Sequence, residues 1–390
     1  MPYLILPVAA IGHVILWMAL VNRLHGFGIH RRSIDLATGL CGLALVALPM
    51  AFVAIVWQHA RSNVAAGDDF AWRIAWWYAS GCALLCGMAA IHRIWLVLHR
   101  ERSGVLLENH TTRVDVRRNN TAEYFAPGIP ALLGRLPGNQ ALDLHVHEKQ
   151  LVIPRLGTAA DGLRIAHITD LHMSGRITKA YFEAAVERVN QLQPDLVAVT
   201  GDLVERDECL DWLPDTLGLL RATSGVFFVL GNHDRRVDQG RLAASLAKLP
   251  LVHLGGCWRQ VAVRNTRIVL AGNELPWYGP APNPEDCPKS DLANRPLRIL
   301  LSHGPDQLDW AVDHDFDLVL AGHNHGGQVR LPAFGAILAP SRSGTRYAGG
   351  VFRRGQTVMH VSRGTSSLTP FRWNCPPEIA LLILRAKQPQ

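Results

Sequence analysis

Three long apolar runs near the start of this chain constrain its fold more than any other feature. They lie at about residues 2–21, 36–57 and 74–98. Each run is long enough to cross, as an α-helix, the roughly 30 Å hydrocarbon layer of a bilayer. Runs of this length with so few charges are seldom buried inside a soluble domain. We therefore expect a membrane anchor of three transmembrane helices over residues 1–102.

The charges beside the apolar runs predict an orientation in the membrane. The loop at residues 22–33 holds three arginines and no acidic residue, whereas the loop at residues 58–70 holds one arginine and two aspartates. Lysine and arginine are enriched in loops on the cytoplasmic side. We expect a multi-pass protein of the cell membrane with an external amino terminus. The chain after the third run would then be cytoplasmic.

The overall charge is explained by the same membrane setting. The formal net charge is +7 at pH 7, and attraction to anionic lipid headgroups accounts for it. No run of lysine and arginine with interleaved aromatic residues indicates a nucleic-acid groove, so we expect no nucleic-acid partner. The seven cysteines are scattered without a Cys-x-x-Cys pattern, which is typical of a reducing compartment.

Residues 103–156 are expected to form a linker followed by an extended segment. Proline and glycine at residues 127–130 and 137–138 exclude long helices there. Residues 142–147 alternate apolar and polar side chains, which predicts a half-buried strand. The apolar residues 129–136 have two open interpretations, a segment on the bilayer surface or an ordinary packed turn. The main domain is expected over residues 157–390.

Short apolar runs alternate with helical patterns after Gly162. Strands are predicted at residues 163–169, 194–200, 225–230, 267–271, 297–301, 316–321, 358–362 and 378–385. Helices are predicted at residues 180–193, 211–221 and 241–249. This alternation predicts an α/β domain.

Residue types that bind metals follow five of the predicted strands. In chain order they are Asp170 and His172, Asp202, Asn232 and His233, His303, and finally His323 and His325. Ligands of open α/β sheets bind beyond the carboxyl ends of the strands. Each of these residues alone has an ordinary explanation as a turn, a cap or a core residue. Five successive strand ends of this kind indicate one site.

The ordered series resembles the calcineurin-like metallophosphoesterase superfamily, through Asp-x-His, Gly-Asp, Gly-Asn-His-Asp, His and Gly-His-x-His. Residues 322–332, 361–364 and 375–379 resemble its bacterial membrane-associated branch. The resemblance covers about residues 163–384 and does not reach the apolar runs. Asn324 stands where relatives usually carry threonine. The resemblance implies a sandwich of two mixed β-sheets flanked by helices, and a metal-dependent phosphoric ester hydrolase.

The resemblance also implies two divalent metal ions. The ligands of one ion would be Asp170, His172, Asp202 and His325. The ligands of the other would be Asp202, Asn232, His303 and His323, with Asp202 shared. Carboxylate, amide and imidazole ligands without thiolate suit Mn²⁺, Fe²⁺ or Zn²⁺. Two such ions would clamp a phosphoester for in-line attack by a bridging hydroxide.

His233 is left without a ligand role beside Asn232. It is the natural candidate for the general acid that protonates the departing oxygen. Asp234 has two open interpretations, an orienting partner of His233 or a residue that organises the turn.

We expect a membrane-anchored phosphoesterase that hydrolyses a phosphodiester or pyrophosphate bond, with a lipid-linked substrate as the first hypothesis. The apolar residues 334–339 would either meet a lipid tail or pack in the core. Trp277 and Tyr278, in a proline-rich loop, are candidates to line a pocket. Two alternatives remain open at this point. One is a phosphodiesterase that acts on soluble nucleotides, and the other is an inactive membrane receptor or scaffold.

Overall fold

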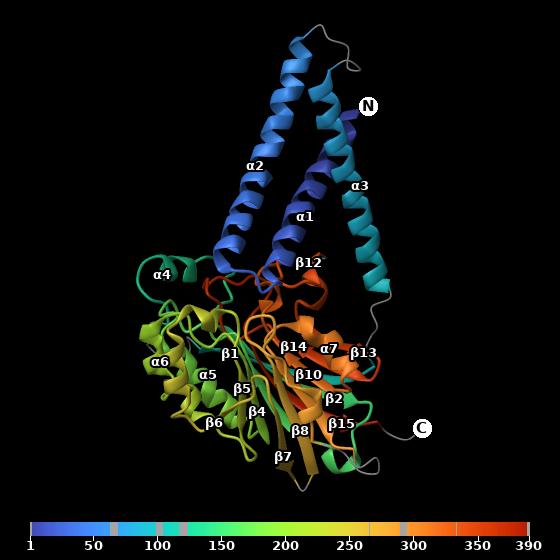
Figure 1. Ribbon diagram of the computed structural model, residues 1–390. Coiled ribbons are helices and arrows are strands. Elements are labelled where there is room, and N and C mark those ends of the chain that lie inside the picture. The colour runs from blue at the N-terminus through green and yellow to red at the C-terminus, as the bar shows by residue number, and fades with distance from the viewer. Residues whose placement is uncertain are drawn as a thin grey trace. The chain divides into compact units, whose positions relative to one another are not determined.

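The computed structural model describes residues 2–62, 69–98, 104–116, 124–264, 266–288, 295–332 and 334–387. The chain divides into two compact units, whose elements are labelled in Figure 1. The first unit comprises Met1–Arg100 with Pro340–Gly344, and the second comprises Glu101–Ala339 with Thr345–Gln390.

The first unit contains three long helices, α1 (Leu6–His25), α2 (Arg31–Arg61) and α3 (Phe70–Leu98). All three are long and apolar enough to cross a membrane, by length and composition. The predicted apolar runs fall on these helices, and α2 extends beyond its run at both ends. Large apolar side chains are exposed along all three helices. A helix that is apolar on every side is typical of a membrane span, and together these helices indicate a membrane protein.

A polar cluster joins the three helices around His13. Pro49 in α2 has no N–H, so the carbonyl of Leu45 lacks its usual partner within the helix. His13 Nε2 of α1 lies 3.0 Å from this carbonyl oxygen and donates to it. His13 Nδ1 then accepts from the hydroxyl of Tyr78 in α3 at 2.6 Å, and this hydroxyl accepts from Trp17 Nε1 at 3.3 Å. His13, which lies within the first apolar run, therefore holds the helices together.

Two mixed β-sheets form the second unit. The larger sheet has the strand order β1-β2-β15-β3-β4-β5-β6, and the smaller has the order β13-β14-β10-β9-β8-β7. The larger sheet consists of β1 (Leu106–Asp115), β2 (Asp143–Ile153), β15 (Glu378–Ala386), β3 (Arg164–Ile168), β4 (Leu196–Thr200), β5 (Val226–Val229) and β6 (Leu251–His253). The smaller consists of β13 (Gly350–Arg354), β14 (Thr357–Val361), β10 (Leu318–Ala321), β9 (Leu297–Ser302), β8 (Thr266–Asn273) and β7 (Trp258–Val263). A separate hairpin pairs β11 (Arg330–Leu331) with β12 (Gly335–Ala336).

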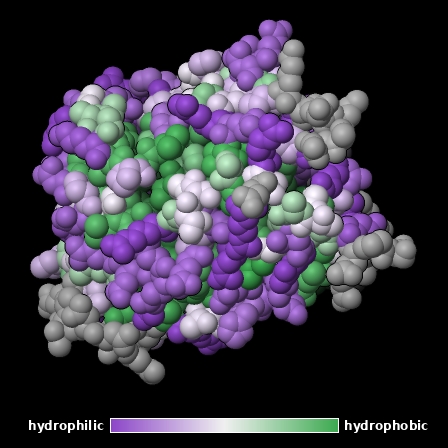
Figure 2. All heavy atoms as spheres, turned by 90° about the horizontal axis from the view of Figure 1, so that it is seen from below, coloured by the Kyte–Doolittle hydropathy of each residue, from purple (hydrophilic) through white to green (hydrophobic). Residues whose placement is uncertain are grey.

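The strands nearest the site are parallel and buried on both faces. In β4, Leu196 and Ala198 belong to the core that also holds apolar residues of the smaller sheet, while Val197 and Val199 belong to the core that holds α5 (Lys179–Gln191). Burial on both faces explains why these strands read as continuous apolar runs rather than alternating ones. The outer surface drawn in Figure 2 is mostly hydrophilic, with hydrophobic side chains visible between the hydrophilic ones. The predicted α/β sandwich of two mixed sheets is confirmed.

Three shorter helices complete the second unit, α4 (Ile129–Gly134), α6 (Gln239–Leu246) and α7 (Leu308–Asp313). The helix predicted at residues 211–221 is wrong. Two 3-10 turns, Asp207–Trp212 and Leu217–Leu219, occupy this region. Pro214 lies between them, and proline disfavours an α-helix interior because it removes a donor and clashes with the preceding turn.

The linker and extended segment expected over residues 103–156 contain two long strands. Strands β1 and β2 lie in this region and belong to the larger sheet. β2 pairs in parallel with β15 from His145↔Glu378 to Ile153↔Ala386. The alternation at residues 142–147 predicted part of β2. Its partner comes more than 220 residues later, and local sequence carries no sign of that pairing.

A buried ion pair of the larger sheet contacts a histidine of the smaller sheet. Lys149 Nζ in β2 donates to Glu378 in β15 and lies 2.8 Å from His360 Nε2 in β14. Arg363 Nε donates to the same carboxylate at 2.9 Å. Burial opposes ionisation of Glu378, but Lys149 and His360 outweigh it and hold its pKa well below the ordinary range. This stabilisation is therefore present above the ordinary glutamate pKa, and it is lost as the pH falls toward the depressed folded-state value.

Lys149→Met is expected to lower the stability of the second unit by about 3–5 kcal/mol, because it leaves the buried Glu378 carboxylate without its nearest cation. Denaturant unfolding of the detergent-solubilised protein, followed by tryptophan fluorescence, would measure the change. Lys179→Met is the matched control, since Lys179 pairs with Asp215 at the surface and both side chains are partly exposed. Lys179→Met should lower the free energy of unfolding by less than about 1 kcal/mol. Equal losses in the two variants would contradict this prediction.

Candidate metal centre

All seven predicted metal ligands follow the carboxyl ends of strands in the two sheets. Asp170 and His172 follow β3, Asp202 follows β4, Asn232 follows β5, His303 follows β9, and His323 and His325 follow β10. Strands β3, β4 and β5 are parallel neighbours in one sheet, and β9 and β10 are parallel neighbours in the other. Their carboxyl ends therefore meet, and the structure brings all seven side chains together.

The first group of donor atoms comes from Asp170, His172 and His325, with Asp202 beside it. His172 Nε2 lies 2.9 Å from His325 Nε2. His325 Nε2 lies 3.5 Å from Asp170 Oδ1, and His172 Nε2 lies 3.5 Å from Asp202 Oδ2. Donor atoms that converge this closely can share one cation.

The second group surrounds the ring of His303. Its Nε2 lies 3.0 Å from Asn232 Oδ1, 3.2 Å from Asp202 Oδ2 and 3.1 Å from His323 Nδ1. The same oxygen of Asp202 therefore reaches both groups. This arrangement provides two adjacent places for a cation, with one carboxylate between them.

The backbone is strained at most of these residues. Five of the ten non-glycine residues with positive φ in the described part of the chain are candidate ligands: Asp170 (53°), His172 (48°), Asp202 (54°), His323 (71°) and His325 (49°). Left-handed backbone is uncommon for residues with a side chain, and it concentrates at functional sites. The left-handed backbone conformation turns these side chains from the strand ends toward one centre.

Two glycines make room for the buried carboxylates. A Cβ atom at Gly231 would lie 2.3 Å from Asp202 Oδ1, and one at Gly322 would lie 2.4 Å from Asp170 Oδ2. No side chain fits at either position unless the site shifts. The glycines that precede these strand-end residues are therefore explained by close approach as well as by the turn itself.

The imidazole rings are oriented for metal binding. His303 Nδ1 donates to the carbonyl of Thr200 at 2.8 Å, and His172 Nδ1 donates to Glu205 Oε1 at 2.5 Å. A proton held on Nδ1 leaves the lone pair of Nε2 directed into the site. Metal-binding histidines commonly have an acceptor of this kind on the second nitrogen.

The electrostatics of the site also fit cations. Burial disfavours protonation of His303, but the Asp202 carboxylate outweighs burial and raises the pKa of His303 to about 9. Burial likewise opposes ionisation of Asp202, yet His303 and His233 hold its pKa well below the ordinary range. The buried carboxylate thus requires positive charge beside it, and divalent ions bound by these donors would supply it.

His233 lies at the edge of the site and is held by Glu205. The Nδ1 atom of His233 pairs with Glu205 Oε1, the same oxygen that accepts from His172. Arg236 Nη1 donates to the other oxygen of Glu205 at 2.8 Å. Sequence reasoning missed Glu205. The only signal was an acidic residue three positions after Asp202, which is common in loops.

Asp234 does not orient His233. Its carboxylate accepts backbone N–H groups from four residues: Asp202 at 3.0 Å, Leu203 at 2.7 Å, Val204 at 3.1 Å and Gly231 at 2.8 Å. His233 is not among these contacts, which support the alternative of a turn-organising residue over that of an orienting partner. A buried carboxylate that accepts so many N–H groups fixes two strand-end loops against each other.

Glu205→Gln is expected to lower kcat/KM about 10- to 100-fold, because both His172 and His233 lose their charged acceptor. Initial rates with a soluble phosphodiester at saturating metal would measure the loss, and a metal titration would show whether affinity falls as well. Glu208→Gln, an exposed residue of the same loop, is the control and should leave both quantities unchanged. Wild-type rates and affinity in Glu205→Gln would refute this role of Glu205.

Trp277 forms a wall of the site. Its ring centroid lies 4.7 Å from that of His323 and 5.3 Å from that of His303. The expectation that Trp277 lines a pocket agrees with this position. A bulky apolar ring beside the donor atoms would limit the access of water to this side of the centre.

A sandwich of two mixed sheets, with carboxylate, amide and imidazole donors converging at its strand ends, defines a metal-dependent hydrolase. The family model for calcineurin-like phosphoesterases matches residues 163–327, which include all seven candidate ligands. The chain is 32% identical over 226 residues to Phosphodiesterase YaeI of Escherichia coli, a match that covers 57% of this chain and 82% of that protein. The chain therefore belongs to the calcineurin-like phosphoesterase family, whose members are metal-dependent phosphoric ester hydrolases and typically bind two divalent metals.

Two further relatives have more specific names. The chain is 26% identical over 282 residues to UDP-2,3-diacylglucosamine pyrophosphatase LpxG of Chlamydia muridarum, covering 59% of this chain and 86% of that protein. It is 28% identical over 256 residues to a transmembrane protein with metallophosphoesterase domain of Bos taurus, covering 61% of this chain and 56% of that protein. The name of the second relative thus combines this family with a membrane protein, as the apolar helices of this chain also indicate.

Proposed function

We propose that this protein is a membrane-anchored phosphoesterase that uses two divalent ions to hydrolyse a phosphodiester or pyrophosphate bond. One observation carries the proposal: seven donor residues from five strand ends form two groups that share the Asp202 carboxylate. An inactive receptor or scaffold would have no need for a complete donor set with a strained backbone and paired acceptors behind its histidines.

The proposed ligands of the first ion are Asp170, His172, Asp202 and His325. Those of the second ion are Asp202, Asn232, His303 and His323. Oxygen and nitrogen donors without thiolate favour Mn²⁺, Fe²⁺ or Zn²⁺. When bound, two such ions supply the positive charge that holds phosphate oxygens and acidifies an attacking water.

His233 is proposed as the general acid. Glu205 fixes its Nδ1, so the opposite nitrogen is the one available to a departing oxygen. Arg236 Nη2 lies 3.4 Å from His233 Nε2, which places a guanidinium beside the same position. A cation there would attract a phosphate group while His233 protonates the leaving oxygen.

The proposed substrate is a lipid-linked phosphodiester or pyrophosphate in the membrane that the anchor spans. The three apolar helices support this, and so does the relative LpxG, whose name gives a diacylated sugar nucleotide as its substrate. The excess of arginine at residues 22–33 supports a cytoplasmic catalytic unit on a multi-pass anchor.

A metal-dependent hydrolysis screen tests the proposal. Detergent-solubilised protein would be assayed with Mn²⁺, Fe²⁺ or Zn²⁺ against lipid-linked phosphoesters, soluble nucleotides and bis-p-nitrophenyl phosphate. We expect hydrolysis of the soluble diester and of at least one lipid-linked compound, and loss of both with a chelator. Activity on nucleotides but on no lipid would favour the soluble-substrate alternative. No activity with any metal would favour the scaffold.

A further inference from the structure

Two segments of the second unit carry most of its exposed apolar side chains. Ten large apolar residues are exposed in the described part of this unit, and seven of them lie at residues 129–136 and 331–338. We call these seven the apolar rim: Ile129, Leu132, Leu136, Leu331, Phe334, Ile337 and Leu338. Monomeric soluble proteins rarely leave such residues gathered in the open unless the surface binds something.

The two segments lie against one strip of chain at residues 369–374. Asn139 Nδ2 donates to the carbonyl of Leu133 at 2.8 Å and to that of Pro370 at 2.9 Å, which fastens α4 to the strip. On the other side, the N–H of Arg330 in β11 donates to the carbonyl of Trp373 at 3.0 Å. The rim residues thus belong to one continuous region of the surface.

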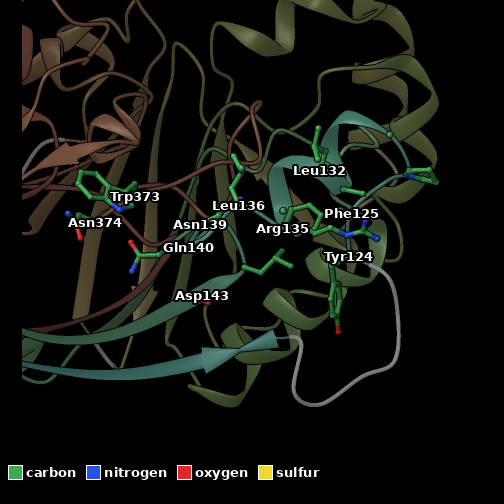
Figure 3. Close-up of a pocket in the computed structure, with 16 residues that line it drawn as sticks. Tyr124, Phe125, Leu132, Arg135, Leu136, Asn139, Gln140, Asp143, Trp373 and Asn374 are labelled. Carbon is green, nitrogen blue, oxygen red and sulfur yellow. The ribbon is translucent and has the colours of Figure 1, made fainter.

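A pocket of about 1220 Å³ opens beside α4 in this region. Figure 3 shows Trp373 and Asn374 on one side of it and Phe125 and Leu132 on the other. All of the α4 residues are at least partly exposed, so the helix presents its apolar side chains without a covering element in the described part of the chain.

The rim borders the candidate metal centre. Arg372, in the strip that joins the two segments, is buried and its Nη2 lies 3.2 Å from His325 Nδ1. On the other side, β11 begins five residues after His325 in the chain. A molecule bound at the metal centre would therefore be close to whatever covers the rim.

The charges around the rim match an anionic bilayer surface. Residues 124–142 and 326–350 contain no aspartate or glutamate. Their residues in the second unit include three arginines, Arg135, Arg330 and Arg346. From Leu338 the chain continues through one residue into Pro340–Gly344, which belongs to the unit of the membrane helices. Apolar side chains among basic ones are typical of surfaces that enter the headgroup region.

We propose that the apolar rim inserts into the interfacial layer of the bilayer that the three helices cross. The rim then holds the mouth of the metal centre at the lipid surface. This contact does not depend on hydrolysis. Its consequence for substrate choice, that the centre receives lipid headgroups directly from the membrane, rests on the proposed function.

Labelling of introduced cysteines tests the contact in the full-length protein. Leu132→Cys, Phe334→Cys and the control Leu219→Cys would be placed in nanodiscs of phosphatidylcholine and phosphatidylglycerol, one chain per disc. Leu219 is 50% exposed and lies outside the rim. Each variant would react with a water-soluble maleimide, and peptide mass spectrometry would report labelling at that site alone.

We expect the cysteines at the two rim positions to react at least fivefold more slowly than the cysteine at position 219. Equal rates would overturn the proposal, and protection that appears only at several chains per disc would assign the rim to a second copy instead.

Activity provides the second measurement. The double variant Leu132→Asp/Phe334→Asp should lose at least tenfold on a lipid-linked phosphoester in vesicles and less than twofold on bis-p-nitrophenyl phosphate. Leu219→Asp should lose neither activity. Equal losses or no loss on both substrates would overturn the role of the rim in substrate access. If the wild type hydrolyses nothing, the proposed function fails, whereas the labelling experiment still decides the membrane contact.

Discussion

Asp202→Ala is expected to reduce kcat/KM about 10³-fold and to lower the metal content below two ions per chain. A single oxygen of Asp202 lies 3.5 Å from His172 Nε2 and 3.2 Å from His303 Nε2, so its removal weakens both cation positions at once. Metal ions supply several kcal/mol of transition-state stabilisation in such sites, and about 4 kcal/mol corresponds to a 10³-fold change in rate. Elemental analysis and initial rates on a soluble diester would measure the two effects.

Asp211→Ala is the control for this variant, because Asp211 is an exposed aspartate a few residues further along the chain. It should keep the wild-type metal content and rate. Full metal content together with full activity in Asp202→Ala would remove the basis for a shared carboxylate.

His233→Ala is expected to keep both metals. Its loss of activity should be larger for substrates with a poorer leaving group. General acid catalysis contributes about 10²- to 10⁴-fold when the departing oxygen needs a proton. An alkyl phosphodiester has such an oxygen, whereas p-nitrophenolate leaves as a stable anion. The loss should therefore lie in this range for the alkyl ester and be far smaller for the p-nitrophenyl ester. Rates on the two esters, with metal analysis of the same samples, measure the difference.

Equal losses on the two esters would count against His233 as the proton donor and would point to a role in binding. His110→Ala is the matched control, since His110 is exposed on β1. Its rates on both esters should equal those of the wild type. A fall in metal content in His233→Ala would show that the residue acts through its neighbour Asn232.

The candidate ligands could be predicted from the sequence because the same short pattern marks both the end of a strand and a metal-binding residue type. A continuous apolar run followed by Gly-Asp or Gly-His marks both the end of a buried strand and a donor residue, as at Asp202 and His323. Parallel strands bring such ends together whatever the intervening loops do. The order of the strand ends therefore predicted the convergence that the structure shows.

Other features depend on contacts between distant residues, which local patterns do not record. In the sequence, Glu205 looks like an ordinary acidic residue of a loop, and only the folded structure shows that it contacts both His172 and His233. The neighbouring carboxylate of Asp234 faces backbone N–H groups instead of a histidine, and nothing in the order of residues separates these two roles. The pairing of β2 with β15 was hidden for the same reason.

The left-handed backbone at five candidate ligands has a consequence for how the centre would be loaded. Backbone hydrogen bonds such as that from the N–H of Asp170 to the carbonyl of Gly201, at 3.0 Å, hold these conformations. The conformational cost is then met while the protein folds, not when an ion arrives. Binding of an ion would then require little rearrangement of the backbone at these residues. The same rigidity makes the cavity selective, because donors that cannot move apart discriminate among ions by size.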